Sequence, residues 1–317
     1  MASTQALLRP PHDVVALQAA DAVAPVLTRV PTSAASTAIA PRRRRRPSVQ
    51  EVAVSLAWLL LALLSLCAIA PQWVATQSPL EMQSDAVLLG PSAAHWFGTD
   101  AFGRDMFALV VYGARQSLLV GLSAVAVGGA VGISFGLLAG YAGGWVDSVL
   151  MRTIDVWMAI PSLLLAIALA TALGPGIFNI ILAISIAAAP RYARVLRGQA
   201  MAVRSRAFVE AARAAGASHL AILRGHILPH CLGQILVLAT LGVGNAILVG
   251  ASLSFLGLGV NDATPDWGYL LTQGRGYLTV AWWTVTFPGL TVTLLVISIN
   301  LLGDALRRRL DPRRGRR

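Results

Sequence analysis

Six long apolar stretches alternate with polar segments along the chain. A membrane-spanning helix needs about 20 apolar residues, because the hydrocarbon core of a bilayer is about 30 Å thick. The six predicted spans are residues 52–75, 117–142, 156–173, 177–192, 232–257 and 280–302. This pattern predicts an all-α polytopic membrane protein with six transmembrane helices.

The third and fourth spans meet at Gly174-Pro175-Gly176, a turn that no continuous helix would carry. The fourth span is short and contains Pro190. Arg191, Arg194 and Arg197 follow at its end. We expect this helix to reach the membrane interface near residue 192, where long basic side chains can extend into water.

The arginines predict the orientation, because cytoplasmic loops carry an excess of positive residues. With the N-terminus inside, all but three of the 25 basic residues fall on the cytoplasmic side. The exceptions are Arg104, Arg115 and Arg275. Both termini are therefore expected to be cytoplasmic.

Composition divides the chain further. Residues 1–48 are rich in Ala, Pro, Ser and Thr and include five arginines at 42–46, which predicts a disordered basic cytoplasmic tail. Because a span begins a few residues later, we expect these arginines to contact anionic membrane lipid and no nucleic acid. Residues 49–112 hold the first span and an extracytoplasmic segment, 113–304 a membrane domain with a cytoplasmic loop at 191–229, and 305–317 a second basic tail.

Several classes of chemistry are excluded or disfavoured by composition. Charged residues make up 12% of the chain and hydrophobic residues 56%, against about 25% charged in soluble domains. The chain has no lysine, so it cannot contain a GxxxxGK phosphate loop. Cys67 and Cys231 are far apart, and Pro229 separates His226 from His230. We therefore expect a non-enzymatic chain with no catalytic residue, metal or cofactor of its own.

No ionisable residue lies in the middle of a predicted span, which disfavours proton coupling. Asp155 is expected to pair with Arg152 near the inner end of the third span, and Asp304 with Arg307 or Arg308 at the end of the sixth. Polar residues within the spans, such as Asn245 and Asn300, are expected to bond between helices. Sodium sites built from backbone carbonyls keep a gradient-driven secondary transporter open as an alternative.

Glycines recur every fourth residue in the second span. Small residues at this spacing allow two helix backbones to approach closely. The pattern fits a helix that moves against its neighbour, and it fits static close packing equally well. The four residues are Gly128, Gly132, Gly136 and Gly140.

The loop between the fourth and fifth spans is much longer than a connection requires. Residues 202–215 have helix-forming composition, Gly216 can end that helix, and Ser218 can cap a second short helix through Leu223. Two short helices would form a projection that receives force from a separate ATPase. The alternative is an amphipathic helix lying on the lipid headgroups.

The loop contains Glu210-Ala211-Ala212, Gly216 and Leu228-Pro229, with the proline thirteen residues after the glycine. In these residues it resembles the EAA loop of ABC importer permeases. His226 stands where the general pattern has isoleucine.

A second segment has the pattern GTDxxGRD, formed by Gly98, Thr99, Asp100, Gly103, Arg104 and Asp105. This pattern resembles the dipeptide/oligopeptide/nickel permease family. Residues 254–259 and 265–268 are also similar to that family. From the residues alone, we expect Thr99 or Asp100 to cap a helical turn and Arg104 to pair with a nearby aspartate.

The resemblance implies the type I ABC importer permease fold in the bacterial cytoplasmic membrane. It also implies a homologous second permease subunit, two ATP-binding subunits that hold ATP and magnesium, and an extracytoplasmic solute-binding protein. The implied cargo is di- or oligopeptides, with nickel or haem as alternatives within the same class.

Overall fold

The computed structural model describes residues 49–259 and 266–310, and within these ranges the regular secondary structure is helical. The predicted tail at 1–48 and the end of the chain after Leu310 lie outside the described residues, as does Pro265 of the 265–268 segment. The helices are α1 (Val49–Ile69), α2 (Pro71–Val74), α3 (Met106–Ala142), α4 (Gly144–Met158), α5 (Ser162–Leu173), α6 (Ile177–Arg204), α7 (Ala207–Ala214), α8 (His219–Ile222), α9 (Leu228–Phe255), α10 (Trp267–Gly274) and α11 (Trp283–Leu310).

In the described part of the chain, five helical segments are long and apolar enough to span a membrane. They are α1, α3, α6, α11 and the continuous stretch His219–Phe255 that contains α9. The predicted third span is not one helix: α4 and α5 meet at 83°. Pro161 explains the break, because proline lacks an amide hydrogen and disfavours helical geometry in the residue before it. Six spans result when this bent pair is counted as one.

The apolar stretch predicted to end near residue 192 is only the first part of a longer helix, because α6 continues to Arg204 with Pro190 inside it. Beyond the proline, α6 remains packed on α3, and this packing favours a continuous helix. Arg191 therefore lies near the middle of a 28-residue helix.

The glycine row of α3 lies against α6. A Cβ atom added to Gly132 would be 2.2 Å from the carbonyl oxygen of Ala189, and one added to Gly136 would be 2.4 Å from that of Ala193. Gly128 and Gly140 approach the next carbonyls of α6 in the same way, each at 2.6 Å. The two backbones are therefore in direct contact over three helical turns.

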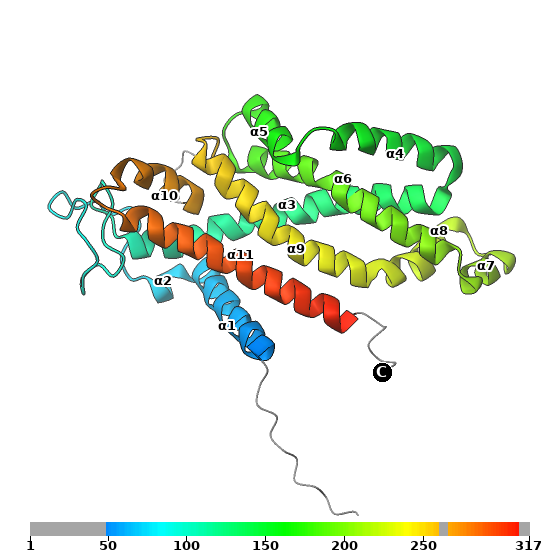
Figure 1. Ribbon diagram of the computed structural model, residues 1–317, viewed down its shortest axis with the longest axis horizontal. Coiled ribbons are helices and arrows are strands. Elements are labelled where there is room, and N and C mark those ends of the chain that lie inside the picture. Colours follow the sequence, from blue (N-terminus) through cyan, green and yellow to red (C-terminus); the bar gives the residue numbers. More distant parts are fainter. Residues whose placement is uncertain (1–48, 260–265, 311–317) are drawn as a thin grey trace, which may run out of the picture. The chain divides into compact units, whose positions relative to one another are not determined.

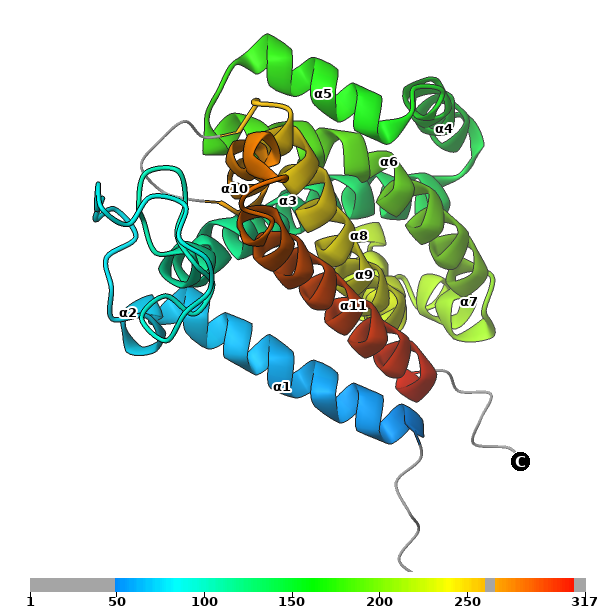
Figure 2. The same cartoon turned by 60° about the vertical axis from the view of Figure 1, so that its left-hand side comes forward.

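Other helices surround this pair (Figures 1 and 2). Helix α9 packs on α3 and α6, α11 packs on α9, and α1 packs on α11 and α3. The long segment between α2 and α3 lies with α10 at one end of the bundle, and α7 and α8 lie at the other (Figure 1).

Ion pairs join α4 to α6. Arg194 contacts Asp155 at 2.6 Å, and Arg197 contacts Asp147 at 2.5 Å. The expected pairing of Asp155 with Arg152 is therefore wrong, because α4 lies beside α6 and brings the carboxylate to a different helix. In the part of the chain that the structure describes, Asp304 also forms no ion pair with Arg307 or Arg308.

Candidate functional site

The loop between α6 and α9 projects from the bundle as two short helices, α7 and α8 (Figure 1). Helix α7 occupies only Ala207–Ala214 of the predicted helix over 202–215, because α6 extends to Arg204. Glu210 lies in its first turn, where a carboxylate is stabilised by the helix dipole. The side chains of Glu210 and Ala211 are exposed, and Ala212 is half-buried.

Gly216 ends α7 in the left-handed conformation, with φ of +81°. The amide of Ala217 donates to the carbonyl of Ala212, and the amide of Gly216 donates to that of Arg213. These two bonds form a Schellman motif, which satisfies carbonyls at the end of the helix. A Cβ at Gly216 would meet no atom within 4 Å, so the backbone angle and not crowding favours glycine here.

Three side chains anchor the projection in the core. Val209, Ile222 and Ile227 are fully buried in the same hydrophobic cluster as residues of α3, α6 and α9. The Tyr141 hydroxyl, at the end of α3, lies 2.7 Å from Nδ1 of His219. These contacts link the projection to the ends of three long helices.

The second short helix was expected to be a separate unit, but it is continuous with the next helix. Ser218 caps α8 by accepting from the amide of Ala221, but a π-helical turn at Leu223–Ile227 then continues directly into α9. Leu228 and Pro229 form the first turn of α9, with Leu228 half-buried and Pro229 exposed.

The histidines of the loop have packing roles. Nδ1 of His230 donates to the carbonyl oxygen of His226 at 2.6 Å, and its ring stacks on Phe208 with centroids 4.8 Å apart. The described residues contain no group of three or more His, Cys, Asp or Glu side chains placed to hold a metal.

A cavity of about 150 Å³ lies between α3, α5, α6 and α9. Its polar lining consists of Ser162, Arg191, Tyr192 and Asn245. Asn245 was expected to bond between helices, but within the described residues its side chain makes no hydrogen bond and is exposed. The sequence did not predict this cavity, because Arg191 and Tyr192 line it from the part of α6 where the predicted span ends.

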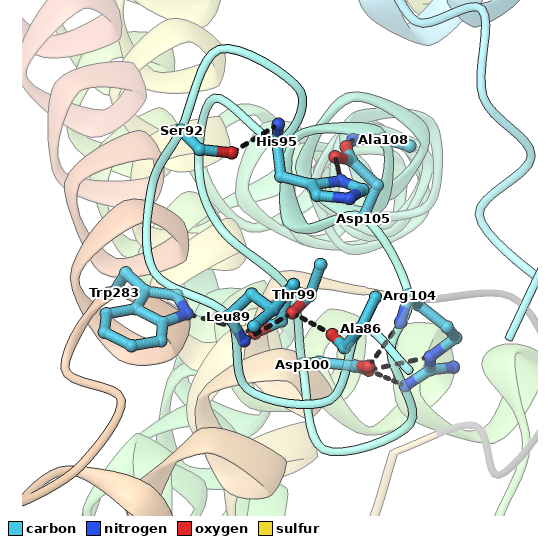
Figure 3. A network of polar contacts seen from close by, with 10 residues as sticks. All are labelled: Ala86, Leu89, Ser92, His95, Thr99, Asp100, Arg104, Asp105, Ala108 and Trp283. Atoms are coloured by element: carbon cyan, nitrogen blue, oxygen red, sulfur yellow. Dashed lines mark hydrogen bonds and ion pairs between the residues drawn. The ribbon is translucent and has the colours of Figure 1, made fainter. Parts of the chain in front are cut away.

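The GTDxxGRD segment folds into a network of internal polar contacts (Figure 3). The hydroxyl of Thr99 donates to the carbonyl of Ala86 at 2.5 Å and accepts from the amide of Leu89 at 2.8 Å. Arg104 pairs with Asp100 at 2.6 Å, as expected. The Trp283 indole of α11 donates to the carbonyl of Thr99 at 3.0 Å.

Asp105, not Thr99 or Asp100, caps a helix. Its carboxylate accepts from the amide of Ala108 in the first turn of α3 and contacts Nδ1 of His95 at 2.9 Å. Asp100 instead accepts from the amides of Phe102 and Arg104 and so closes a turn. The cap was misplaced because several polar residues precede α3, and only the folded turn determines which one faces its amides.

Two glycines of this segment have positive φ angles, +74° at Gly98 and +71° at Gly103. A Cβ at Gly103 would lie 1.9 Å from the carbonyl oxygen of Gln83. The segment therefore requires glycine for both its turns and its close backbone contacts. Its polar side chains satisfy one another, which indicates a structural role.

A second element at the same end of the bundle, α10, is fixed in the same manner. Asp266 caps it by accepting from the amide of Tyr269. Burial raises the pKa of the Asp266 carboxyl above its ordinary value. The fully buried indole of Trp267 donates to the carbonyl of Val110 on α3. Trp267 and Trp283 thus bind α10 and the GTDxxGRD segment to the bundle. No spacing in the sequence indicates which carbonyls accept from these two indoles.

Comparison with known proteins gives consistent results. The family "Binding-protein-dependent transport system inner membrane component" matches residues 132–316. The probable D,D-dipeptide transport system permease protein DdpC of Escherichia coli strain K12 is 44% identical over 257 residues, covering 81% of this chain and 86% of that protein. The di/tripeptide transport system permease protein DppC of Pseudomonas aeruginosa strain UCBPP-PA14 is 44% identical over 261 residues, covering 80% and 86%.

A third relative is the glutathione transport system permease protein GsiD of Escherichia coli O6:K15:H31, which is 42% identical over 276 residues and covers 86% of this chain and 89% of that protein. Among solved structures, a chain of the MetNI methionine ABC transporter in inward facing conformations aligns with a TM-score of 0.55 and 20% identity. It covers 65% of this chain and 98% of that chain. That likeness shows the fold. The chain therefore belongs to the family of binding-protein-dependent transport system inner membrane components and is a multi-pass membrane permease.

Proposed function

We propose that this permease forms half of the translocation path of an ATP-driven importer of di- or oligopeptides. The observation that carries the proposal is the α7–α8 projection, which is exposed at its tip and anchored by buried side chains to several long helices. A rigid lever of this kind can transmit motion from a partner protein into the membrane.

The chain has no lysine and hence no GxxxxGK phosphate loop with which to use ATP itself. ATP and magnesium would therefore be held by two separate ATP-binding subunits. A homologous second permease would complete the path, and an extracytoplasmic solute-binding protein would deliver the cargo.

Peptides are proposed as the cargo because the named relatives are transport permeases for D,D-dipeptides, di/tripeptides and glutathione. Each covers at least 80% of this chain. Nickel and haem are the alternative cargoes that an uptake assay would reveal.

The contact with the ATPase is assigned to Glu210, Ala211, Ala212 and Gly216. The exposed Ala211 and the half-buried Ala212 present a narrow surface that fits into a cleft, and Glu210 offers a charge to a basic partner. Leu228 and Pro229 begin α9, the helix that would receive the motion.

Reconstitution tests the proposal. Proteoliposomes are prepared with the permease, its paired permease, the two ATP-binding subunits and the binding protein. Uptake of labelled peptide is then measured with and without ATP. We expect uptake that requires ATP and the binding protein. Uptake driven by an ion gradient alone would refute the ATP-driven mechanism, and ATP-driven uptake of nickel or haem with no peptide uptake would refute the assigned cargo.

The coupling role has its own test. Gly216→Val forces a β-branched residue into a positive-φ position and should distort the projection, whereas Gly198→Val changes an exposed glycine of α6 whose φ is not positive and whose Cβ would meet no atom within 4 Å. We expect Gly216→Val to lower peptide uptake at least tenfold per ATP hydrolysed, with Gly198→Val close to the parent. Equal uptake per ATP in the two variants would contradict the assigned lever.

A further inference from the structure

Three arginines lie on consecutive turns of α6, and they differ in their partners. Arg194 and Arg197 each pair with an aspartate of α4. Arg191 is exposed and has neither a carboxylate partner nor a hydrogen bond among the described residues. It lies instead on the wall of the cavity between α3, α5, α6 and α9.

The position of this cavity along the helices places Arg191 level with the middle of the predicted fifth span. The neighbouring Tyr192 contacts Gly242, near the middle of the 28-residue α9. Asn245, one turn further along α9, lines the same cavity. A cationic group at this depth is costly unless it faces water or an anion, and such residues commonly mark substrate pathways.

The other polar groups of the cavity are neutral. The hydroxyl of Tyr192 and the side-chain amide of Asn245 form no hydrogen bond within the described residues. Ser162, at the start of α5, lines the opposite part of the wall. The described lining contains no acidic residue. The cavity therefore offers one positive charge with neutral hydrogen-bonding groups around it.

The fit between α6 and α9 keeps the Tyr192 hydroxyl at the cavity. A Cβ added to Gly242 would lie against that hydroxyl, 2.0 Å away. Only glycine at this position leaves room for the ring, and Tyr192 itself is 4% exposed. The hydroxyl is thus held in a fixed place next to Arg191.

We infer that Arg191, with Tyr192 and Asn245, binds the carboxylate of the cargo as it passes through the permease. A guanidinium presents two parallel N–H groups that match the two oxygens of a carboxylate. The neutral groups supply further hydrogen bonds without trapping a cation. For the peptide cargo proposed above, on which this inference rests, the group bound is the C-terminal carboxylate.

The first test compares a tripeptide with its C-terminal amide in the reconstituted complex, each at a concentration that saturates the binding protein. A hydrogen-bonded charged pair contributes about 1.5–3 kcal/mol, or roughly a tenfold change or more in rate. We expect Arg191→Gln to reduce tripeptide uptake about tenfold and amide uptake less than twofold. Arg191→Lys should fall between the parent and Arg191→Gln, because lysine keeps the charge and loses the planar fork.

Arg152→Gln is the matched control, since Arg152 is an exposed arginine of α4 outside the cavity lining. It should leave both cargoes unchanged. Equal losses for tripeptide and amide in Arg191→Gln, or no loss for the tripeptide, would overturn the inference. Absence of peptide uptake by the parent complex would instead refute the proposed function.

A second test does not depend on how the binding protein treats the amide. Arg191→Cys is treated with an aminoethyl methanethiosulfonate, which restores a positive charge, or with a neutral ethyl reagent of similar length. Both native cysteines are buried, and the treated parent complex controls for their modification. We expect the cationic reagent alone to recover tripeptide uptake. Identical uptake after the two reagents, or failure of either to react, would show that no cation on this wall meets the cargo.

Discussion

At the scale of single residues, the polar side chains of the GTDxxGRD segment form hydrogen bonds and ion pairs within the fold. Thr99 is fully buried and uses its hydroxyl as both donor and acceptor. Arg104 is paired with Asp100, and its guanidinium lies 5.0 Å from the centroid of the Phe102 ring. These groups satisfy each other, which makes the segment a rigid cover over the start of α3.

Thr99→Val tests this cover, because valine has nearly the same shape and no hydroxyl. It leaves the Ala86 carbonyl and the Leu89 amide without their partner, at a cost of about 1–3 kcal/mol each. We expect a clearly lower midpoint of thermal unfolding for the solubilised protein. Ser92→Ala is the control, since Ser92 accepts from His95 in an exposed position, and it should unfold near the parent temperature. A Thr99→Val midpoint equal to that of Ser92→Ala would contradict the structural role.

Residue-level prediction from sequence succeeds where partners are close along the chain and fails where they are distant. The Arg104–Asp100 pair spans four residues and was expected. The partners of Asp155 and Trp283 lie 39 and 184 residues away, so no local spacing indicates them. Arg191 lies at the end of the predicted apolar stretch but near the middle of α6, because hydropathy averages do not show where a packed helix ends.

At the scale of helices, apolar stretches locate the spans well and their ends poorly. Helices α3, α6 and α11 all extend beyond the predicted apolar windows. Helical hydrogen bonding and packing on neighbours continue outside the hydrocarbon, whereas the hydropathy pattern stops at its edge. The bend between α4 and α5 was missed for a related reason: the window over 156–173 averages across Pro161.

The contact of α3 with α6 predicts a sharp difference between two glycines of one helix. Gly132→Ala would place a methyl group against the Ala189 carbonyl, which belongs to backbone and cannot move aside cheaply. Overpacking of this kind costs about 1–3 kcal/mol. Gly129→Ala meets only the end of the Ile133 side chain at 3.9 Å, and alanine is the better helix former by about 1 kcal/mol.

We therefore expect Gly132→Ala to lower the thermal midpoint of the purified permease and Gly129→Ala to preserve or raise it. Differential scanning fluorimetry in detergent measures both. If the two variants had the same thermal midpoint, the backbones of α3 and α6 would not be in direct contact at Gly132.

At the scale of the whole molecule, sequence patterns predicted the all-α class and the family, since both follow from composition and short motifs. The order of helices around α3 and α6 was beyond those patterns, because it depends on contacts between segments far apart in the chain. Orientation in the membrane stays a prediction from arginine placement. Arg206, Arg213 and Arg224 lie in the exposed loop at one end of the bundle.

Reporter fusions measure that orientation. Alkaline phosphatase, which is active only outside the cytoplasm, should be inactive when fused after Gly216 or Arg317 and active when fused after Gly90. The reason is the excess of arginine in the first two regions. Activity after Gly216 together with inactivity after Gly90 would reverse the assigned topology.

The π-helical turn at Leu223–Ile227 sets the spacing of the whole projection. Ile222 and Ile227 are five residues apart and both fully buried, although an unbroken α-helix would point them about 140° apart. The wide π-helical turn compensates for this mismatch, so the thirteen residues from Gly216 to Pro229 fix the rotation of α7 relative to α9. Loss of a single residue there would rotate α7 by about 100° around the axis of α9 and turn its exposed residues in another direction, while every helix stayed intact.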